Sequence, residues 1–144
     1  MKPTPAGWPR ISSTLIYDDA NKAIEWLGKA FGFTVRLKVE DEKGGVAHAE
    51  LTFGDGLIMV SSAKDAGTRG LYKGPQSFGG ASTHSLMVYV DDIEAHHARA
   101  AAAGAKITAP VEMHDYGEEY WADRSYGATD LEGHSWWFSQ RVRG

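Results

Sequence analysis

Hydrophobic and polar residues alternate in several short stretches of this chain, and each such stretch predicts a β-strand. In the clearest one, His134, Trp136 and Phe138 project to one face of a sheet, whereas Ser135 and Trp137 project to the other. Two adjacent tryptophans on opposite faces imply a hydrophobic core on one side. On the other side they imply a second core, a partner chain or a ligand cavity.

Two stretches have the spacing of an amphipathic helix instead. Residues 19–32 carry apolar side chains at helical intervals, and residues 93–103 form a second, alanine-rich helical segment. An Asp-Asp pair precedes each stretch and can cap its first turn. Gly32 and Gly104 follow them and can adopt the left-handed conformation that commonly ends a helix.

The order of the elements repeats along the chain. Strands are predicted at residues 11–17, 33–40, 46–53 and 57–62, and again at 84–90, 106–113, 125–129 and 134–140. We therefore predict an α+β fold of two tandem βαβββ modules whose sheets form a cup. The modules would span about residues 10–63 and 83–141 of one domain, 1–144, with a glycine-rich linker at 64–82.

The amino-acid composition limits the kinds of partner that the protein can bind. The chain has 144 residues, a net charge of −4 and no run of basic residues, which argues against nucleic-acid binding. No window approaches the ~18 apolar residues of a membrane span. Cysteine is absent, so disulfides and thiolate chemistry are excluded, as is common for a cytoplasmic protein.

Several motifs occur in an order that matches a known family. They are LIYDD at 15–19, AFGF at 30–33, FGDGLIM at 53–59, VYVDDI at 88–93, AAGA at 102–105 and DLEGH at 130–134. Together with the doubled βαβββ order, they resemble the vicinal oxygen chelate superfamily of glyoxalases, bleomycin-resistance proteins and ring-cleaving dioxygenases. The resemblance implies that the concave face shared by two modules holds the site.

The resemblance also implies where a metal would be bound. Metal-using members carry His or Gln in the first strand of each module and Glu in the last strand. By position these places fall at Ser12, Ser85, Met59 or Val60, and Trp137. None is a usual ligand for a divalent cation of this class. The resemblance thus implies a metal-free, bleomycin-resistance-like member that uses no cofactor, and argues against metal-dependent isomerase or dioxygenase chemistry.

His48 and Glu50 are two residues apart on a predicted strand and therefore share a face. They could form a polar pair in solvent, hydrogen-bond a ligand, act as acid and base, or bind a metal. Trp137 could be a stacking wall for a planar or cationic ligand, fill a disused cavity, or pack at a dimer interface.

The loop before the last hairpin is dense in aromatic and charged residues. Tyr116, Trp121 and Arg124 could grip a ligand, or the loop could pack on itself with Arg124 paired to an acidic side chain. The predicted ligand-binding residues are His48, Glu50, Met59, Met87, Tyr116, Trp121, Arg124 and Trp137. No catalytic residue and no metal ligand is assigned.

Three of the other histidines are assigned structural positions, and the roles of His84 and His114 are left open. His96 and His97 are expected on the surface of the second helix, and His134 is expected to anchor its hairpin by a hydrogen bond. Trp136 and Phe138 are expected to pack in the core against a helix.

These observations favour a homodimer that sequesters an aromatic or cationic small molecule without breaking bonds. Its cup could close within one chain or by exchange of modules with a partner. Two alternatives remain: a lyase or isomerase of the same fold that uses His48 and Glu50 or an atypical metal site, and an interaction module whose own side chains fill the cup.

Overall fold

The computed structural model describes residues 1–64 and 71–144, so residues 65–70 of the predicted linker lie outside the described residues. The elements are β1 (Ser13–Tyr17), α1 (Ala20–Phe31), β2 (Thr34–Glu40), β3 (Val46–Phe53), β4 (Gly56–Ser62), a 3₁₀ turn η1 (Pro75–Phe78), β5 (Ser85–Tyr89), α2 (Ile93–Ala102), β6 (Lys106–Asp115), β7 (Ala122–Thr129) and β8 (Ser135–Arg143). Neither α1 nor α2 is long and apolar enough to cross a membrane, and no other described helix is.

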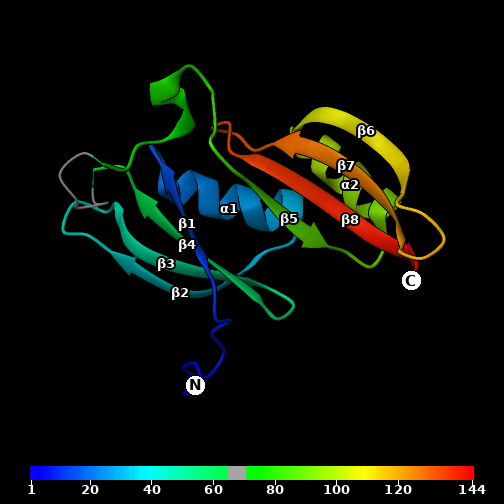
Figure 1. Cartoon of the computed structure of the whole chain (residues 1–144). Helices are drawn as coiled ribbons and strands as arrows, with labels where there is room; N and C mark the ends of the chain where they lie inside the picture. The colour runs from blue at the N-terminus through cyan, green and yellow to red at the C-terminus, as the bar shows by residue number, and fades with distance from the viewer. Residues whose placement is uncertain (65–70) are drawn as a thin grey trace.

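The described strands form two four-stranded mixed sheets with the orders β1-β4-β3-β2 and β5-β8-β7-β6. In each sheet the first strand runs parallel to the last one, and the remaining pairs are antiparallel. Figure 1 shows the two sheets on either side of α1. The α+β fold with a doubled βαβββ order is confirmed.

The helix boundaries follow the predicted capping residues. The Asp19 carboxylate accepts a hydrogen bond from the backbone N–H of Lys22 at 3.1 Å, and Asp92 accepts one from Ala95 at 3.0 Å. Gly32 ends α1 with a φ of 85°, which residues with a Cβ rarely adopt. Each helix therefore begins and ends where the sequence indicates.

The inner faces of the two sheets meet in one core. Trp136 and Phe138 on β8 are fully buried, and their rings lie 5.3 and 4.7 Å from the Phe31 ring of α1, which confirms their predicted position. Trp137 is half-buried on the opposite face of β8. The core thus joins the second sheet to the helix of the first module.

The two helices satisfy each other's C-terminal carbonyl groups. Trp26 of α1 donates its indole N–H to the Ala103 carbonyl oxygen at 2.8 Å. Arg99 of α2 donates to the carbonyl oxygens of Gly28 and Lys29, both at 2.8 Å. Since the last carbonyls of a helix lack partners within it, these contacts favour one relative position of the two modules.

His96 corrects the expectation of a surface histidine. Its Nε2 lies 2.9 Å from the Phe31 carbonyl oxygen, which only accepts, so Nε2 carries the proton. Its Nδ1 then accepts a hydrogen bond from the Tyr126 hydroxyl at 2.7 Å. Burial lowers the pKa of His96. Helical periodicity gave no information about the partners of this ring.

A carboxylate at the β7–β8 turn links the modules a second time. One oxygen of Asp130 accepts the backbone N–H groups of the turn at 3.0 to 3.1 Å. The other accepts from the Tyr17 hydroxyl at 2.6 Å and from the Trp136 indole at 3.1 Å. His134 lies 2.7 Å from the Ile16 carbonyl oxygen, so it anchors the hairpin as predicted.

These contacts turn the helix-bearing faces of both sheets toward each other. The opposite faces, which carry His48 and Glu50 on β3 and Trp137 on β8, therefore point outward. Within one chain they do not form a shared cup.

We predict that His96 makes stability depend on pH. Because its pKa is lower in the folded than in the unfolded state, the unfolded chain binds more protons near pH 6, and the free energy of unfolding falls as the pH drops below 6.5. Urea unfolding at pH 5.0 and 7.5, followed by circular dichroism, should show a smaller pH difference in His96→Gln than in the wild type. His97→Gln, on the same helix, is the matched control. An unchanged difference in His96→Gln would contradict the assignment.

Candidate functional site

A cavity of about 420 Å³ lies on the outer face of the second sheet. It is lined by Met87, Tyr89, His114, Tyr116, Trp121, Asp123, Ser125, Trp137 and Ser139. These side chains come from all four strands of the sheet and from the loop that precedes β7. The period-two alternation of each strand turns them to the same face.

Trp137 forms one wall of this cavity because its neighbour on β7 has no side chain. Gly127 pairs with Trp137 across the two strands, and a Cβ at this position would lie 3.3 Å from the indole ring. On the other side Trp137 pairs with Met87 of β5. The His114 ring meets the indole edge-on, with centroids 6.5 Å apart. The indole therefore has defined contacts on three sides.

Small polar residues line the cavity between the larger side chains. Ser125 and Ser139 pair across β7 and β8, and their hydroxyl oxygens lie 2.8 Å apart. Both residues are buried. One hydroxyl donates to the other, so the accepting serine keeps an O–H group that can donate into the cavity.

The rim is held by an arginine that sequence analysis did not select. Arg141 donates through Nε to Asp123 at 2.6 Å, and Asp123 also accepts from the Tyr89 hydroxyl at 3.0 Å. Arg141 also donates directly to that hydroxyl. Its guanidinium lies 5.2 Å from the ring centroids of both Tyr89 and Trp121. Asp123 is 5% exposed, so this carboxylate is both buried and neutralised.

A second arginine fixes the aromatic loop itself. Arg143 binds both oxygens of Asp115, at 3.0 and 2.6 Å, and donates to the Gly117 carbonyl oxygen at 2.9 Å. The hydrogen bond from Arg143 lowers the pKa of Asp115 to about 2. The rings of Tyr116 and Trp121 lie 5.7 Å apart in the same loop. These contacts hold the loop beside the cavity.

The outer face of the first sheet carries a polar cluster. The Glu50 carboxylate accepts a hydrogen bond from Arg36 at 2.5 Å and lies 3.2 Å from His48 Nε2. Met59 pairs with Glu50 on the neighbouring strand. Arg36 also donates to the Ala6 carbonyl oxygen at 3.1 Å, which ties the N-terminal arm to this face. Glu50 therefore has two side-chain partners within one chain.

The structure divides the predicted site residues into three groups. Met87, Tyr116, Trp121 and Trp137 share the cavity. His48, Glu50 and Met59 lie on the other sheet. Arg124 contacts Glu94 of α2, away from the cavity, which corresponds to the alternative of pairing with an acidic side chain.

Some residues of the cavity and its rim were missed although the sequence contained a signal for them. Trp137 and Ser139 lie on one face of β8. Arg141 is the next residue in this alternation and therefore lies on the same face. Tyr89 likewise follows Met87 on β5. The pairing of Asp123 with Arg141 had no local signal, because it depends on the register of β7 against β8.

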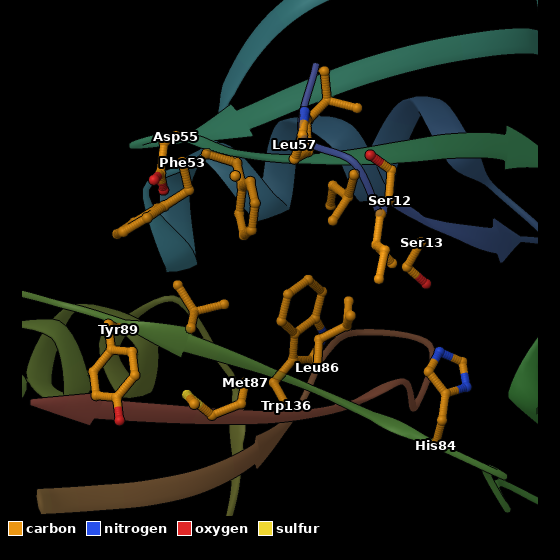
Figure 2. A pocket seen from close by; sticks show the side chains of 16 residues that line it. Ser12, Ser13, Phe53, Asp55, Leu57, His84, Leu86, Met87, Tyr89 and Trp136 are labelled. Carbon is orange, nitrogen blue, oxygen red and sulfur yellow. The ribbon is translucent and has the colours of Figure 1, made fainter. Parts of the chain in front are cut away.

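A larger cavity of about 620 Å³ lies between the two sheets. Figure 2 shows its walls, with Ser12, Phe53, Asp55 and Leu57 on one side and His84, Leu86, Met87 and Trp136 on the other. Met87 and Tyr89 of β5 line both cavities. β1 and β5, each at the edge of its sheet, contribute to opposite walls.

The positions that bind metal in other vicinal oxygen chelate proteins do not fit a divalent cation here. Trp137 packs its indole against Gly127, and Met59 offers a thioether. Ser12 has a buried hydroxyl without a hydrogen-bond partner among the described residues, but it lines the inter-sheet cavity, apart from Trp137. The described residues contain no group of three or more His, Asp or Glu side chains arranged to hold an ion.

Comparison with known proteins supports the assignment of the fold. TioX from Micromonospora sp. ML1 is 30% identical in sequence, with a TM-score of 0.72 over 93% of this chain and 99% of TioX. The protein Mb0911c of Mycobacterium bovis is 30% identical over 94% of this chain and 85% of its own length. TnmS3 from Streptomyces sp. CB03234, described as an antibiotic binding protein, is 15% identical and has a TM-score of 0.65 over 91% of this chain and 93% of TnmS3.

A family model matches nearly the whole chain. It covers residues 10–138, which include the first module, most of the second and every predicted site residue. The chain belongs to the Glyoxalase/Bleomycin resistance protein/Dioxygenase superfamily.

Proposed function

We propose that the protein binds a planar aromatic small molecule in the cavity beside Trp137 and sequesters it without a metal or a chemical step. The observation that carries this proposal is the set of four aromatic rings, those of Tyr89, Tyr116, Trp121 and Trp137, around one cavity of about 420 Å³. Cavities of this size suit small organic ligands. Aromatic walls give a large contact area at a small cost in conformational entropy.

The polar groups of the cavity support binding over catalysis. Ser125 and Ser139 hydrogen-bond to each other, and Asp123 is occupied by Arg141 and Tyr89. A general base must reach a substrate proton, and the Asp123 carboxylate is 5% exposed and held by Arg141 and Tyr89. The engaged groups therefore fix the shape of the cavity. The description of TnmS3 as an antibiotic binding protein agrees with this use of the fold.

We also propose that the protein forms a homodimer with exchanged modules. The outer face with His48 and Glu50 and the outer face with Trp137 point apart in one chain, so a second copy is needed to place them across one cup. Val39, at 45% exposed on the first sheet, and Met87, at 55% on the second, are apolar side chains that such a partner would cover.

The second copy of the chain would bind at the inter-sheet cavity. In the described part of the chain, β1 and β5 are edge strands of their sheets, and edge strands readily pair with another chain. Ile11, which precedes β1 and lines this cavity, is 87% exposed. A second copy of the chain offers strand edges that can pair with β1 and β5, and apolar side chains that can cover Ile11.

A lyase or isomerase activity is the second candidate, and the contact of 3.2 Å between His48 and Glu50 is the observation that favours it. A carboxylate can orient an imidazole for proton transfer. Glu50 is also bound by Arg36, however, and the pair could equally serve as a polar contact for the ligand. If His48→Asn abolished turnover of a glyoxalase-type substrate, this candidate would replace sequestration.

Loss of the indole should weaken binding. Trp137→Ala is expected to reduce the affinity for quinoline, a neutral planar probe, by ~1–3 kcal/mol, the range for stacking of a planar base on an aromatic side chain. Isothermal titration calorimetry measures the affinity. Trp137→Phe, which keeps a smaller ring, should fall between the alanine variant and the wild type. Equal affinity in all three proteins would contradict a stacking role.

Placing a charge at the proposed dimer seam should shift the oligomeric state. Ile11→Asp is expected to raise the dimer dissociation constant at least tenfold, because it would bury a carboxylate in an apolar cavity. Sedimentation equilibrium measures this constant. Met113→Asp places the same charge on an exposed apolar position of β6, at the far edge of the second sheet, and should leave the constant unchanged. A wild-type protein that is monomeric at all concentrations would refute the dimer.

Elemental analysis tests the metal-independent part of the proposal. Protein purified without chelators, and then dialysed against Zn²⁺, Mn²⁺ or Ni²⁺ and desalted, is expected to retain well under one equivalent of metal per chain. The physical reason is that Trp137 and Met59 replace the carboxylate ligands of metal-using members. Stoichiometric retention of one ion would overturn this part of the proposal.

A further inference from the structure

We propose that Arg141 makes the cavity selective for planar guests that carry no positive charge, by occupying the carboxylate and the aromatic faces that would otherwise attract a cation. This inference rests on the proposed function and names the class of ligand for that site. Arg141 acts here as a positioning residue, because it works through Asp123, Tyr89 and Trp121.

The charge balance of the cavity is the first argument. Among the nine described residues that line it, Asp123 is the only carboxylate. One oxygen of Asp123 accepts from Arg141 at 2.6 Å, and the other accepts from the Tyr89 hydroxyl at 3.0 Å. Both oxygens are therefore occupied, and the negative charge is compensated by the guanidinium.

The positions of the rings are the second argument. A cation binds over the face of an aromatic ring because of the negative charge density there. The Arg141 guanidinium already lies 5.2 Å from the ring centroids of Tyr89 and Trp121. A cationic guest at those rings would approach a positive charge at close range. A neutral guest meets no such repulsion and can stack on Trp137.

The neighbouring charged residues do not cancel the repulsion between Arg141 and a cationic guest. Arg143 is paired with Asp115, and Arg124 is paired with Glu94, so each adds little net charge near the cavity. Glu112 lies on the cavity face of β6, opposite Ser125, but is exposed and does not line the cavity. The pair of Arg141 and the 5% exposed Asp123 therefore sets the local potential.

The test compares two probes of the same shape. Quinoline is uncharged at pH 8, and N-methylquinolinium is permanently cationic. We expect the wild type to bind quinoline at least ~10-fold more tightly, as measured by equilibrium dialysis. Arg141→Gln should reverse the preference, because it leaves Asp123 as a buried carboxylate that a cationic guest can neutralise.

Three further variants identify the cause. Arg141→Lys keeps the charge and should keep the preference for quinoline. Arg124→Gln removes an equal charge from a residue that contacts Glu94 away from the cavity, leaves Asp123 paired, and should behave as the wild type. Adding Asp123→Asn to Arg141→Gln should abolish the preference for the cation. Circular dichroism confirms that each variant is folded.

The outcomes distinguish this inference from the proposed function. If the wild type binds both probes equally, or if Arg141→Gln leaves their ratio unchanged, the selectivity role of Arg141 is wrong while the aromatic site stands. If the wild type binds neither probe, both the site and its selectivity are refuted.

Discussion

The packing of α1 against α2 determines how the two sheets are placed relative to each other. Trp26 and Arg99 each satisfy carbonyl groups at the end of the opposite helix, and His96 bridges Phe31 and Tyr126 across the seam. The contacts of Trp26 and His96 are partly buried, so leaving their donors or acceptors unpaired would be costly, whereas those of Arg99 are exposed. The helices therefore fix how the two sheets lie on either side of one core.

The hydrogen bonds of Asp130 add a directional restraint to this apolar contact. The carboxylate of Asp130 accepts hydrogen bonds from the Tyr17 hydroxyl of the first module and from the Trp136 indole N–H of the second. It also accepts the backbone N–H of Gly133 in its own turn. Burial of Trp136 alone would allow the sheets to slide, since hydrophobic contact has no direction. The hydrogen bonds set the angle at which β8 is presented, and with it the position of Trp137 on the outer face.

The fold could be predicted because its signals are local and occur twice. Asp19 and Gly32 bound α1, and the alternation around Trp137 places that indole outside the core. The site could be predicted only in part. Trp121 and Trp137 share the cavity, but the partners of Arg124 and Arg141 depend on strand register and on packing against α2, which no short stretch of sequence encodes. The separation of His48 from Trp137 likewise depends on how the modules pack.

The absence of a side chain at Gly127 couples two positions on neighbouring strands. The indole of Trp137 lies against the bare backbone of β7, and a Cβ there would also lie 2.9 Å from the Thr108 hydroxyl. A methyl group at position 127 would displace the Trp137 indole into the cavity, unless residue 137 had a smaller side chain. The side chains at positions 127 and 137 therefore share one space, and their combined volume sets how large a ligand the cavity can admit.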